Sequence, residues 1–170
     1  MTGELEYITF NTGMGWVGIL GSANRLRRIS LPQPSAQEAL KLLGDEGKYA
    51  TWSPNLFDGL IKRFRIYFNG GKVDFPDELD LSGATPFQRK VWEVTRLIPY
   101  GKTRSYTWVA EQTKKPLAAR AVGQALARNP LPIIIPCHRV VTTTGRLGGF
   151  TGGVEIKRSL LNLEASASLR

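Results

Sequence analysis

The chain has 170 residues, and its hydrophobic share of 42% supports a packed core and argues against a disordered protein. A single cysteine excludes an internal disulfide and leaves a structural zinc site without its usual thiolates. No apolar run approaches the ~20 residues of a membrane helix and the N-terminus lacks a signal-peptide pattern, so the sequence predicts a soluble, cytoplasmic protein.

The net charge of +9 is distributed unevenly along the chain. Residues 1–85 hold 9 Lys and Arg against 10 Asp and Glu, a net charge of −1. Residues 86–170 hold 14 against 4, a net charge of +10. A strongly basic half joined to a neutral one favours binding of a polyanion such as nucleic acid by the second half, although a generically basic surface is the alternative.

The first half begins with strand patterns. Residues 5–10 and 16–20 are predicted as two strands separated by a Gly-containing turn, and residues 26–31 as a third strand that closes a meander. No cluster of His, Cys or carboxylate residues in this half suggests catalysis. We therefore expect a small α+β scaffold.

Two helices are predicted to follow these strands. Ser35, with Glu38 three residues later, forms a capping-box pattern that starts a helix ending near Gly44. Ser53-Pro54 is predicted to cap a second helix, whose apolar residues recur at helical spacing until Asn69. Its apolar stripe is expected to be core.

An acidic stretch with little periodicity, residues 72–85, is interpreted as a linker. It divides the chain into an expected N-terminal scaffold domain, residues 1–80, and a C-terminal domain, residues 81–170. The predicted fold class of the whole chain is α+β.

The second half is predicted to be mainly helical. Thr85-Pro86 supplies a cap and a first-turn proline, and the helix that it starts is broken at residues 98–101. Ser105 can cap a short helix, residues 114–116 form a turn, and residues 117–128 form the next helix.

Two short helices joined by a tight basic turn suggest a helix-turn-helix, with Lys114 and Lys115 of the turn expected to contact DNA. Small residues almost cover the second helix, which would let its backbone lie close to a bulky partner or to the protein's own core. Arg120 projects from that small-residue surface and favours the DNA-facing alternative. The small residues are Ala118, Ala119, Ala121, Gly123, Ala125 and Ala127.

The only cysteine, Cys137, directly precedes the only histidine, His138. A lone cysteine beside an apolar run is often just a small buried hydrophobe. Here prolines fix the approach of the chain, and the glycine-rich residues 145–153 permit a loop that wraps close to a ligand. A Cys-His hydrolase is disfavoured because its base generally comes from a distant part of the chain.

Pro136-Cys-His-Arg-Val140 resembles the active-site signature of the O6-alkylguanine-DNA alkyltransferases (methylated-DNA–protein-cysteine methyltransferases). The resemblance covers about residues 85–166, and the N-terminal half resembles the family's ribonuclease-H-like α+β domain in length and pattern. It implies a C-terminal, winged-helix-like DNA-binding domain. The other matching motifs are Thr85-Pro-Phe-Gln88, Ile98-Pro-Tyr-Gly101, Ser105-Tyr106, Ala118-Ala-Arg-Ala-Val-Gly123, Asn129-Pro130 and Leu160-Leu161-Asn-Leu-Glu164.

The resemblance implies four catalytic residues. Cys137 would be the nucleophile, held as a thiolate, because only the thiolate attacks well. His138 would take its proton through a water, oriented by Glu164, and Tyr106 would donate a proton to the departing guanine.

The same resemblance implies how DNA is held. Arg120 would fill the space left by a flipped base, and Ala121 and Gly123 would let the helix sit in the minor groove. Relatives often carry Tyr-Ser where this chain has Phe150-Thr151, and some carry Met in place of Leu126. The expected base-pocket residues are Val140, Phe150, Thr151, Leu126 and Asn129, the last as a hinge.

The implied function is a single-turnover repair reaction on double-stranded DNA by a monomer, without cofactor or metal. The alkyl group would leave O6-alkylguanine, or O4-alkylthymine, for Cys137. The alternatives are a lesion-binding protein without catalysis, which the thiol argues against, and a helix-turn-helix regulator, which a helix of small residues disfavours.

Overall fold

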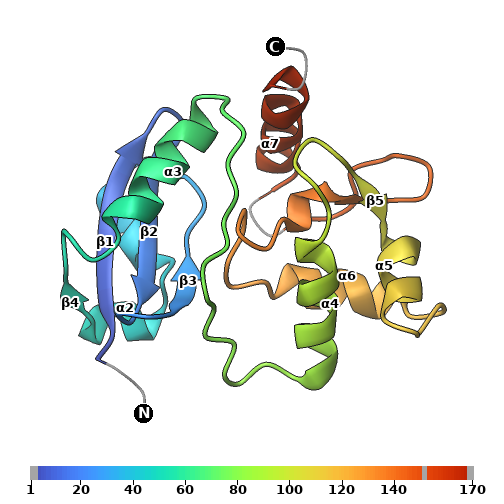
Figure 1. Cartoon of the computed structure of the whole chain (residues 1–170), viewed down its shortest axis with the longest axis horizontal. Helices are drawn as coiled ribbons and strands as arrows, with labels where there is room; N and C mark the ends of the chain where they lie inside the picture. Colours follow the sequence, from blue (N-terminus) through green and yellow to red (C-terminus); the bar gives the residue numbers. More distant parts are fainter. Residues whose placement is uncertain (1–3, 151–152, 168–170) are drawn as a thin grey trace. The chain divides into compact units, whose positions relative to one another are not determined.

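The computed structural model describes residues 4–150 and 153–167, and the chain divides into two compact units, Met1–Leu81 and Ser82–Arg170 (Figure 1). A sheet with helices on both faces forms the first unit, and helices dominate the second. The predicted α+β fold class is confirmed.

A four-stranded sheet forms the centre of the first unit. It comprises β1 (Glu6–Thr12), β2 (Gly15–Gly21), β3 (Leu26–Ile29) and β4 (Thr51–Trp52), in the order β3-β2-β1-β4. The first three strands are the predicted antiparallel meander, whereas β4 pairs in parallel with β1 and was not predicted.

Helices cover opposite faces of this sheet. Phe10 of β1 contacts Phe64 of α3 (Asp58–Phe68), with ring centroids 6.1 Å apart. On the other face, a Cβ on Gly18 would lie 3.1 Å from the carbonyl oxygen of Ala39 in α1 (Ala36–Lys41), so the glycine allows that helix to pack closely. The alternation of β-strand side chains thus builds two apolar layers.

The start of α1 agrees with its predicted cap, because the Ser35 side chain accepts a hydrogen bond from the Glu38 N–H. A short helix, α2 (Asp45–Tyr49), follows. The predicted start of the next helix at Ser53-Pro54 is wrong, since α3 begins at Asp58. The Ser53 N–H instead donates to the Tyr7 carbonyl and extends the sheet.

The predicted linker is bound to the first unit as far as Asp80. The Leu26 N–H donates to the Glu78 carbonyl, and the Asp80 N–H donates to the Leu26 carbonyl. Arg63 forms a two-pronged ion pair with Asp77, at 2.6 and 2.8 Å. The carboxylates of this acidic stretch therefore pair with arginines of the scaffold.

Three helices form the base of the second unit. A complete capping box of Thr85 and Gln88 starts α4 (Pro86–Arg96), as predicted. Ser105 caps α5 (Tyr106–Gln112), and α6 (Ala119–Ala127) follows the turn. The three helices pack on one another around buried apolar side chains.

Above these helices, a buried loop leads into a 3₁₀ turn, η1 (Cys137–Arg139). The short strand β6 (Val140–Val141) continues from the turn and pairs in parallel with β5 (Arg104–Ser105). The last helix, α7 (Val154–Ala167), packs against the turn. This arrangement brings residues from four separate segments together around Cys137.

Candidate active site

Cys137 lies on the wall of a pocket of about 560 Å³. The residue is 7% exposed, so the thiol is nearly buried yet faces a space large enough for a nucleobase. We call this space the Cys137 pocket. It is lined by Tyr106, Ala119, Arg120, Gly123, Gln124, Leu126, Ala127, Cys137, Gly149 and Phe150.

His138 and Glu164 form a fully buried pair next to the thiol. Nε2 of His138 lies 2.5 Å from a carboxylate oxygen of Glu164, although the two residues are 26 positions apart. The 3₁₀ turn supplies the imidazole and α7 supplies the carboxylate. The structure thus joins the residues that the sequence predicted as base and orienting acid.

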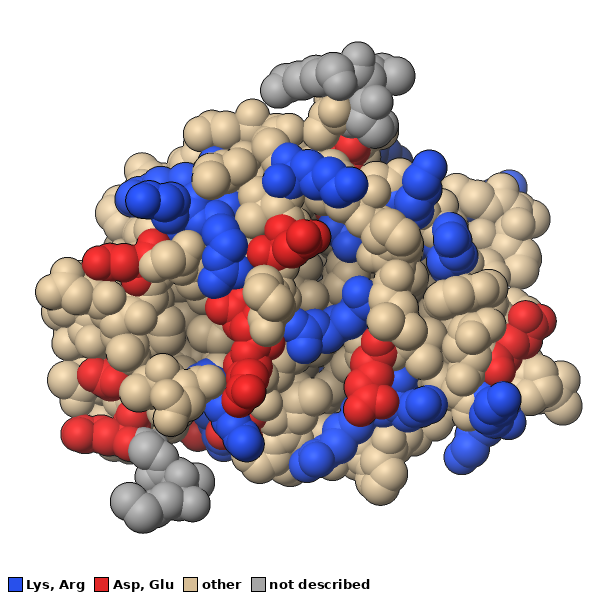
Figure 2. Space-filling model, viewed as in Figure 1, with Lys and Arg blue, Asp and Glu red and all other residues tan. Residues whose placement is uncertain are grey.

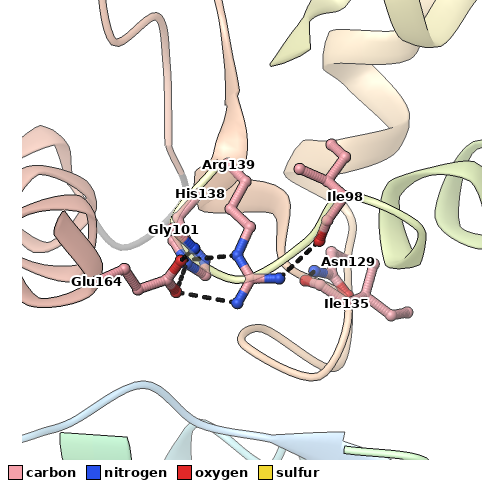
Figure 3. Close-up of polar contacts among 7 residues, drawn as sticks. All are labelled: Ile98, Gly101, Asn129, Ile135, His138, Arg139 and Glu164. Carbon is pink, nitrogen blue, oxygen red and sulfur yellow. Dashed lines mark hydrogen bonds and ion pairs between the residues drawn. The ribbon is translucent and has the colours of Figure 1, made fainter. Parts of the chain in front are cut away.

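Arg139 and Gly101 complete the surroundings of the carboxylate (Figure 3). Nε and Nη2 of Arg139 donate to the two oxygens of Glu164, at 2.8 and 3.1 Å, and the Gly101 N–H donates at 3.1 Å. Nη1 of Arg139 donates to the Ile98 carbonyl at 2.8 Å. A buried carboxylate is stable only when it is paired and hydrogen-bonded in this way.

These contacts shift the pKa values of the pair. Burial raises the pKa of Glu164, but hydrogen bonds from His138 and Arg139 and the positive charge of Arg139 outweigh it and hold that pKa far below its usual range. Burial lowers the pKa of His138, against the opposing effect of Glu164. The pair is therefore a carboxylate beside a neutral imidazole, which can accept a proton.

The thiol itself is not poised as a free thiolate. Burial raises the pKa of Cys137, while a hydrogen bond from Asn129 and the charge of Lys157 lower it. Because burial opposes ionisation, a proton acceptor is needed where the thiolate forms. The sequence predicted Cys137 to be held as a thiolate at rest. The structure instead favours a thiol that ionises during the reaction.

Asn129 ties the end of α6 to the loop that carries the cysteine. Its Nδ2 donates to the Ile135 carbonyl at 2.9 Å (Figure 3). Its Oδ1 accepts from the Leu131 N–H at 2.9 Å. This position agrees with a hinge between the helix and the site.

Lys157 was not predicted, yet it is fully buried at the centre of the site. Its Nζ donates to the Val140 carbonyl at 2.7 Å and lies 3.3 Å from the Tyr106 hydroxyl and 3.4 Å from the Gly149 carbonyl. Burial lowers its pKa to about 8, with a smaller opposing effect of Cys137. The signal in the sequence was its spacing, because Lys157, Leu160 and Glu164 share the buried face of α7.

Tyr106, the first residue of α5, lines the pocket and contacts the glycine-rich loop. Burial raises the pKa of its hydroxyl, and the charge of Cys137 raises it further, so the hydroxyl keeps its proton at neutral pH. A Cβ on Gly148 would lie 2.7 Å from that hydroxyl oxygen, so only glycine fits there. The phenol is thus held as a donor at the pocket wall.

The outer surface of α6 carries small side chains together with the exposed Arg120 and Gln124. A Cβ on Gly123 would meet only the Tyr106 ring, at 3.8 Å or more, so packing inside the protein does not require this glycine. In the turn before α6, Lys114 and Lys115 are exposed, and Lys114 has a left-handed φ of 67°.

The remaining predicted residues have different positions. Leu126 and Phe150 line the pocket, whereas Val140 lies behind it, where its carbonyl accepts from Lys157. Ala121 is on α6 but does not line the pocket, and Thr151 lies outside the described residues. Gln124, which also lines the pocket, was not predicted, because it lies just outside the matching motif that ends at Gly123.

Within residues 4–150 and 153–167, no three His, Cys, Asp or Glu residues are grouped as metal ligands, and no helix could span a membrane.

The first unit carries ion pairs such as Arg27 with Asp80 and Arg63 with Asp77, which fits its charge of −1. The face shown in Figure 2 carries both signs of charge. The +10 charge of residues 86–170 is therefore a property of the unit that holds the Cys137 pocket.

Comparison with known proteins agrees with this arrangement. Residues 86–166 match the model of the 6-O-methylguanine DNA methyltransferase, DNA binding domain. The chain is 49% identical over 162 residues to a methylated-DNA–protein-cysteine methyltransferase of Mycobacterium tuberculosis, covering 95% of this chain and 93% of the relative. It is 39% identical over 159 residues to the constitutive enzyme of Bacillus subtilis, covering 93% and 94%.

Solved structures give the same result. The crystal structure of Mycobacterium tuberculosis OGT in complex with DNA superposes with a TM-score of 0.81 and 40% identity, covering 95% of this chain and 94% of that one. The O6-methylguanine-DNA methyltransferase of Pyrococcus kodakaraensis superposes with a TM-score of 0.70 and 32% identity, covering 94% and 98%. The chain therefore belongs to the methylated-DNA–protein-cysteine methyltransferase family.

Proposed function

We propose that this protein repairs double-stranded DNA by moving one alkyl group from O6 of guanine onto Cys137, once per molecule. The observation that carries the proposal is a thiol on the wall of a base-sized pocket, beside a buried His138–Glu164 pair. A thioether is a stable product, so the acceptor is consumed. O4-alkylthymine, which also presents an alkylated oxygen next to a ring nitrogen, is a second expected substrate.

The reaction begins with loss of the thiol proton. The neutral imidazole of His138 takes this proton, relayed by a water, and Glu164 stabilises the charged ring. The sulfur then attacks the alkyl carbon in line, forming the S–C bond as the C–O6 bond breaks. Tyr106 donates a proton to the purine as it leaves, because an anionic guanine is a poor leaving group, and the proton on His138 restores the phenol through solvent.

Access to O6 requires the nucleotide to leave the base stack, since the thiol lies inside a pocket. The helix α6 would enter the minor groove, where Gly123 and its small neighbours allow close approach. Arg120, exposed at the pocket rim, would fill the gap in the duplex. Lys114 and Lys115 would contact the phosphates.

Replacing the nucleophile separates chemistry from binding. In Cys137→Ser we expect no alkyl transfer from O6-methylguanine duplex, measured with a labelled methyl group, because the hydroxyl stays protonated. Duplex affinity, measured by fluorescence anisotropy, should remain within about twofold of wild type, since no DNA contact is lost. Transfer by the serine variant at the wild-type rate would refute the assignment of Cys137.

The role of Arg120 is tested by comparing two substrates. Arg120→Ala should slow transfer from O6-methylguanine in duplex by about tenfold or more, yet change the reaction with free O6-benzylguanine by less than about twofold. The matched control is Arg128→Ala, which removes an exposed arginine from the far end of α6. Equal losses on both substrates, or equal effects of the two variants, would contradict a role in base flipping.

A further inference from the structure

Arg139 makes several buried polar contacts, although the proposed reaction assigns it no role. Its guanidinium contacts both oxygens of Glu164 and the Ile98 carbonyl. The guanidinium carbon, Cζ, lies 5.6 Å from the centroid of the Tyr100 ring. It therefore links the cysteine turn to α7 and to the loop after α4 (Figure 3).

The contacts of Arg139 decide how Glu164 acts on His138. One carboxylate oxygen accepts from Arg139 and the Gly101 N–H, and the other accepts from Arg139 and contacts His138. The carboxylate is thus fixed in one orientation, and its charge is neutralised by a permanent cation. A buried carboxylate without that cation would instead stabilise an imidazolium.

We propose that Arg139 is a positioning residue that fixes Glu164 against His138 and, by neutralising the carboxylate, keeps the imidazole uncharged until the Cys137 proton arrives. The inference rests on the proposed function only for the identity of that proton. The charge state of His138 at rest is a property of the protein without substrate.

The groups around His138 act on its pKa in opposite directions. Burial is the main cause that lowers its pKa, Glu164 raises it, and the charges of Arg139 and then Lys157 lower it. From the other elements, the titratable groups that approach the turn are the phenols Tyr106 on α5 and Tyr100 in the loop after α4. The charged residues of α4, which packs against the turn, are exposed or half-buried: Arg89, Lys90, Glu93 and Arg96.

The chain offers a direct measurement, because His138 is its only histidine. One imidazole signal in a carbon–proton correlation NMR spectrum, followed against pH in the protein without DNA, reports the charge of this ring. In the wild type we expect a neutral imidazole at pH 7. A protonated ring at pH 7 would overturn the inference without any variant.

Two substitutions then separate the charge of Arg139 from its shape. In Arg139→Gln the midpoint of the His138 titration should rise by about one pH unit or more, because the neutralising cation is gone. In Arg139→Lys, which keeps a cation, the midpoint should stay near that of wild type. The matched control is Arg158→Gln, which removes an exposed arginine of α7 that pairs with Glu155 at 3.3 Å.

Two results would overturn the inference. One is an unchanged His138 midpoint in folded Arg139→Gln, and the other is a rise in Arg139→Lys as large as the rise in Arg139→Gln. If Arg139→Gln does not fold, the wild-type ring and Arg139→Lys still decide it. A merely structural role would lower folded yield without moving the midpoint.

Transfer from free O6-benzylguanine keeps the two proposals apart. If Arg139 acts as inferred, the acidic limb of the rate–pH profile of Arg139→Gln should move upward together with the NMR midpoint. If the His138 midpoint shifts in Arg139→Gln but the wild-type protein transfers no alkyl group, the proposed function is contradicted and the inference about Arg139 stands. If the wild-type protein transfers the alkyl group but the His138 midpoint does not move in Arg139→Gln, the inference about Arg139 is contradicted and the proposed function stands.

Discussion

At the scale of single residues, the charge next to the sulfur decides how readily the thiolate forms. Lys157 is a fully buried cation, and its described hydrogen-bond partners are carbonyl groups and a phenol. Its charge lowers the pKa of Cys137 and so offsets part of the effect of burial. Burial of a lysine charge costs free energy. Near Cys137, that charge favours the thiolate, which is consistent with a role in the site.

Lys157→Met should therefore slow transfer from free O6-benzylguanine by about tenfold at pH 7, because loss of the neighbouring cation raises the pKa of the thiol and lowers the thiolate fraction. The difference from wild type should narrow above pH 8, where Lys157 itself loses its charge. A rate–pH profile measures both effects. A loss of transfer rate that is equal at every pH would indicate a packing effect and contradict an electrostatic one. The control is Lys90→Met, which replaces an exposed lysine of α4.

Single residues also show what the sequence could provide. Cys137, His138 and Glu164 were found because a motif places them, and the structure brings them together. Their chemical roles remain predictions. Lys157 and Arg139 were missed, since a charged residue in a helix or a motif is ordinarily exposed, and only its buried neighbours reveal a core position.

At the scale of elements, the glycine-rich loop controls the position of Tyr106. Gly148 has a left-handed φ of 71° and leaves no room for a Cβ next to the phenol. Gly145 has a similar φ of 84°, with nothing within 4 Å of its Cβ position. The two glycines therefore have the same backbone requirement and differ in the contact with Tyr106.

Alanine at these two positions should have unequal effects. Both Gly145→Ala and Gly148→Ala should lose about 1 kcal/mol of stability from the left-handed backbone, measured by urea unfolding. Only Gly148→Ala should also slow alkyl transfer, by about tenfold, because the displaced phenol no longer faces the leaving purine. Equal transfer rates in the two variants would argue against Tyr106 as the proton donor.

Local signals predicted some elements well and others badly. Caps at Ser35, Thr85 and Ser105 were reliable, because a side chain hydrogen bond within four residues does not depend on the rest of the fold. Ser53-Pro54 looked like another cap, but the sheet uses the Ser53 N–H for β4. The pairing of residues 78–80 with Leu26 was likewise invisible, since such contacts join distant positions.

At the scale of the whole molecule, the two units divide their properties. The first holds the four-stranded sheet and arginines that pair with carboxylates, and it carries a charge of −1. The second holds the Cys137 pocket and a charge of +10. This division favours DNA binding by the second unit, which also holds the only cysteine of the chain.

The most direct test of the account is the mass of the intact wild-type protein after incubation with excess O6-methylguanine duplex. We expect the mass to rise by one methylene group, once per chain, and peptide mapping to place it on Cys137. A protein left unmodified by the duplex, a second addition, or a methyl group on any other residue would contradict the account.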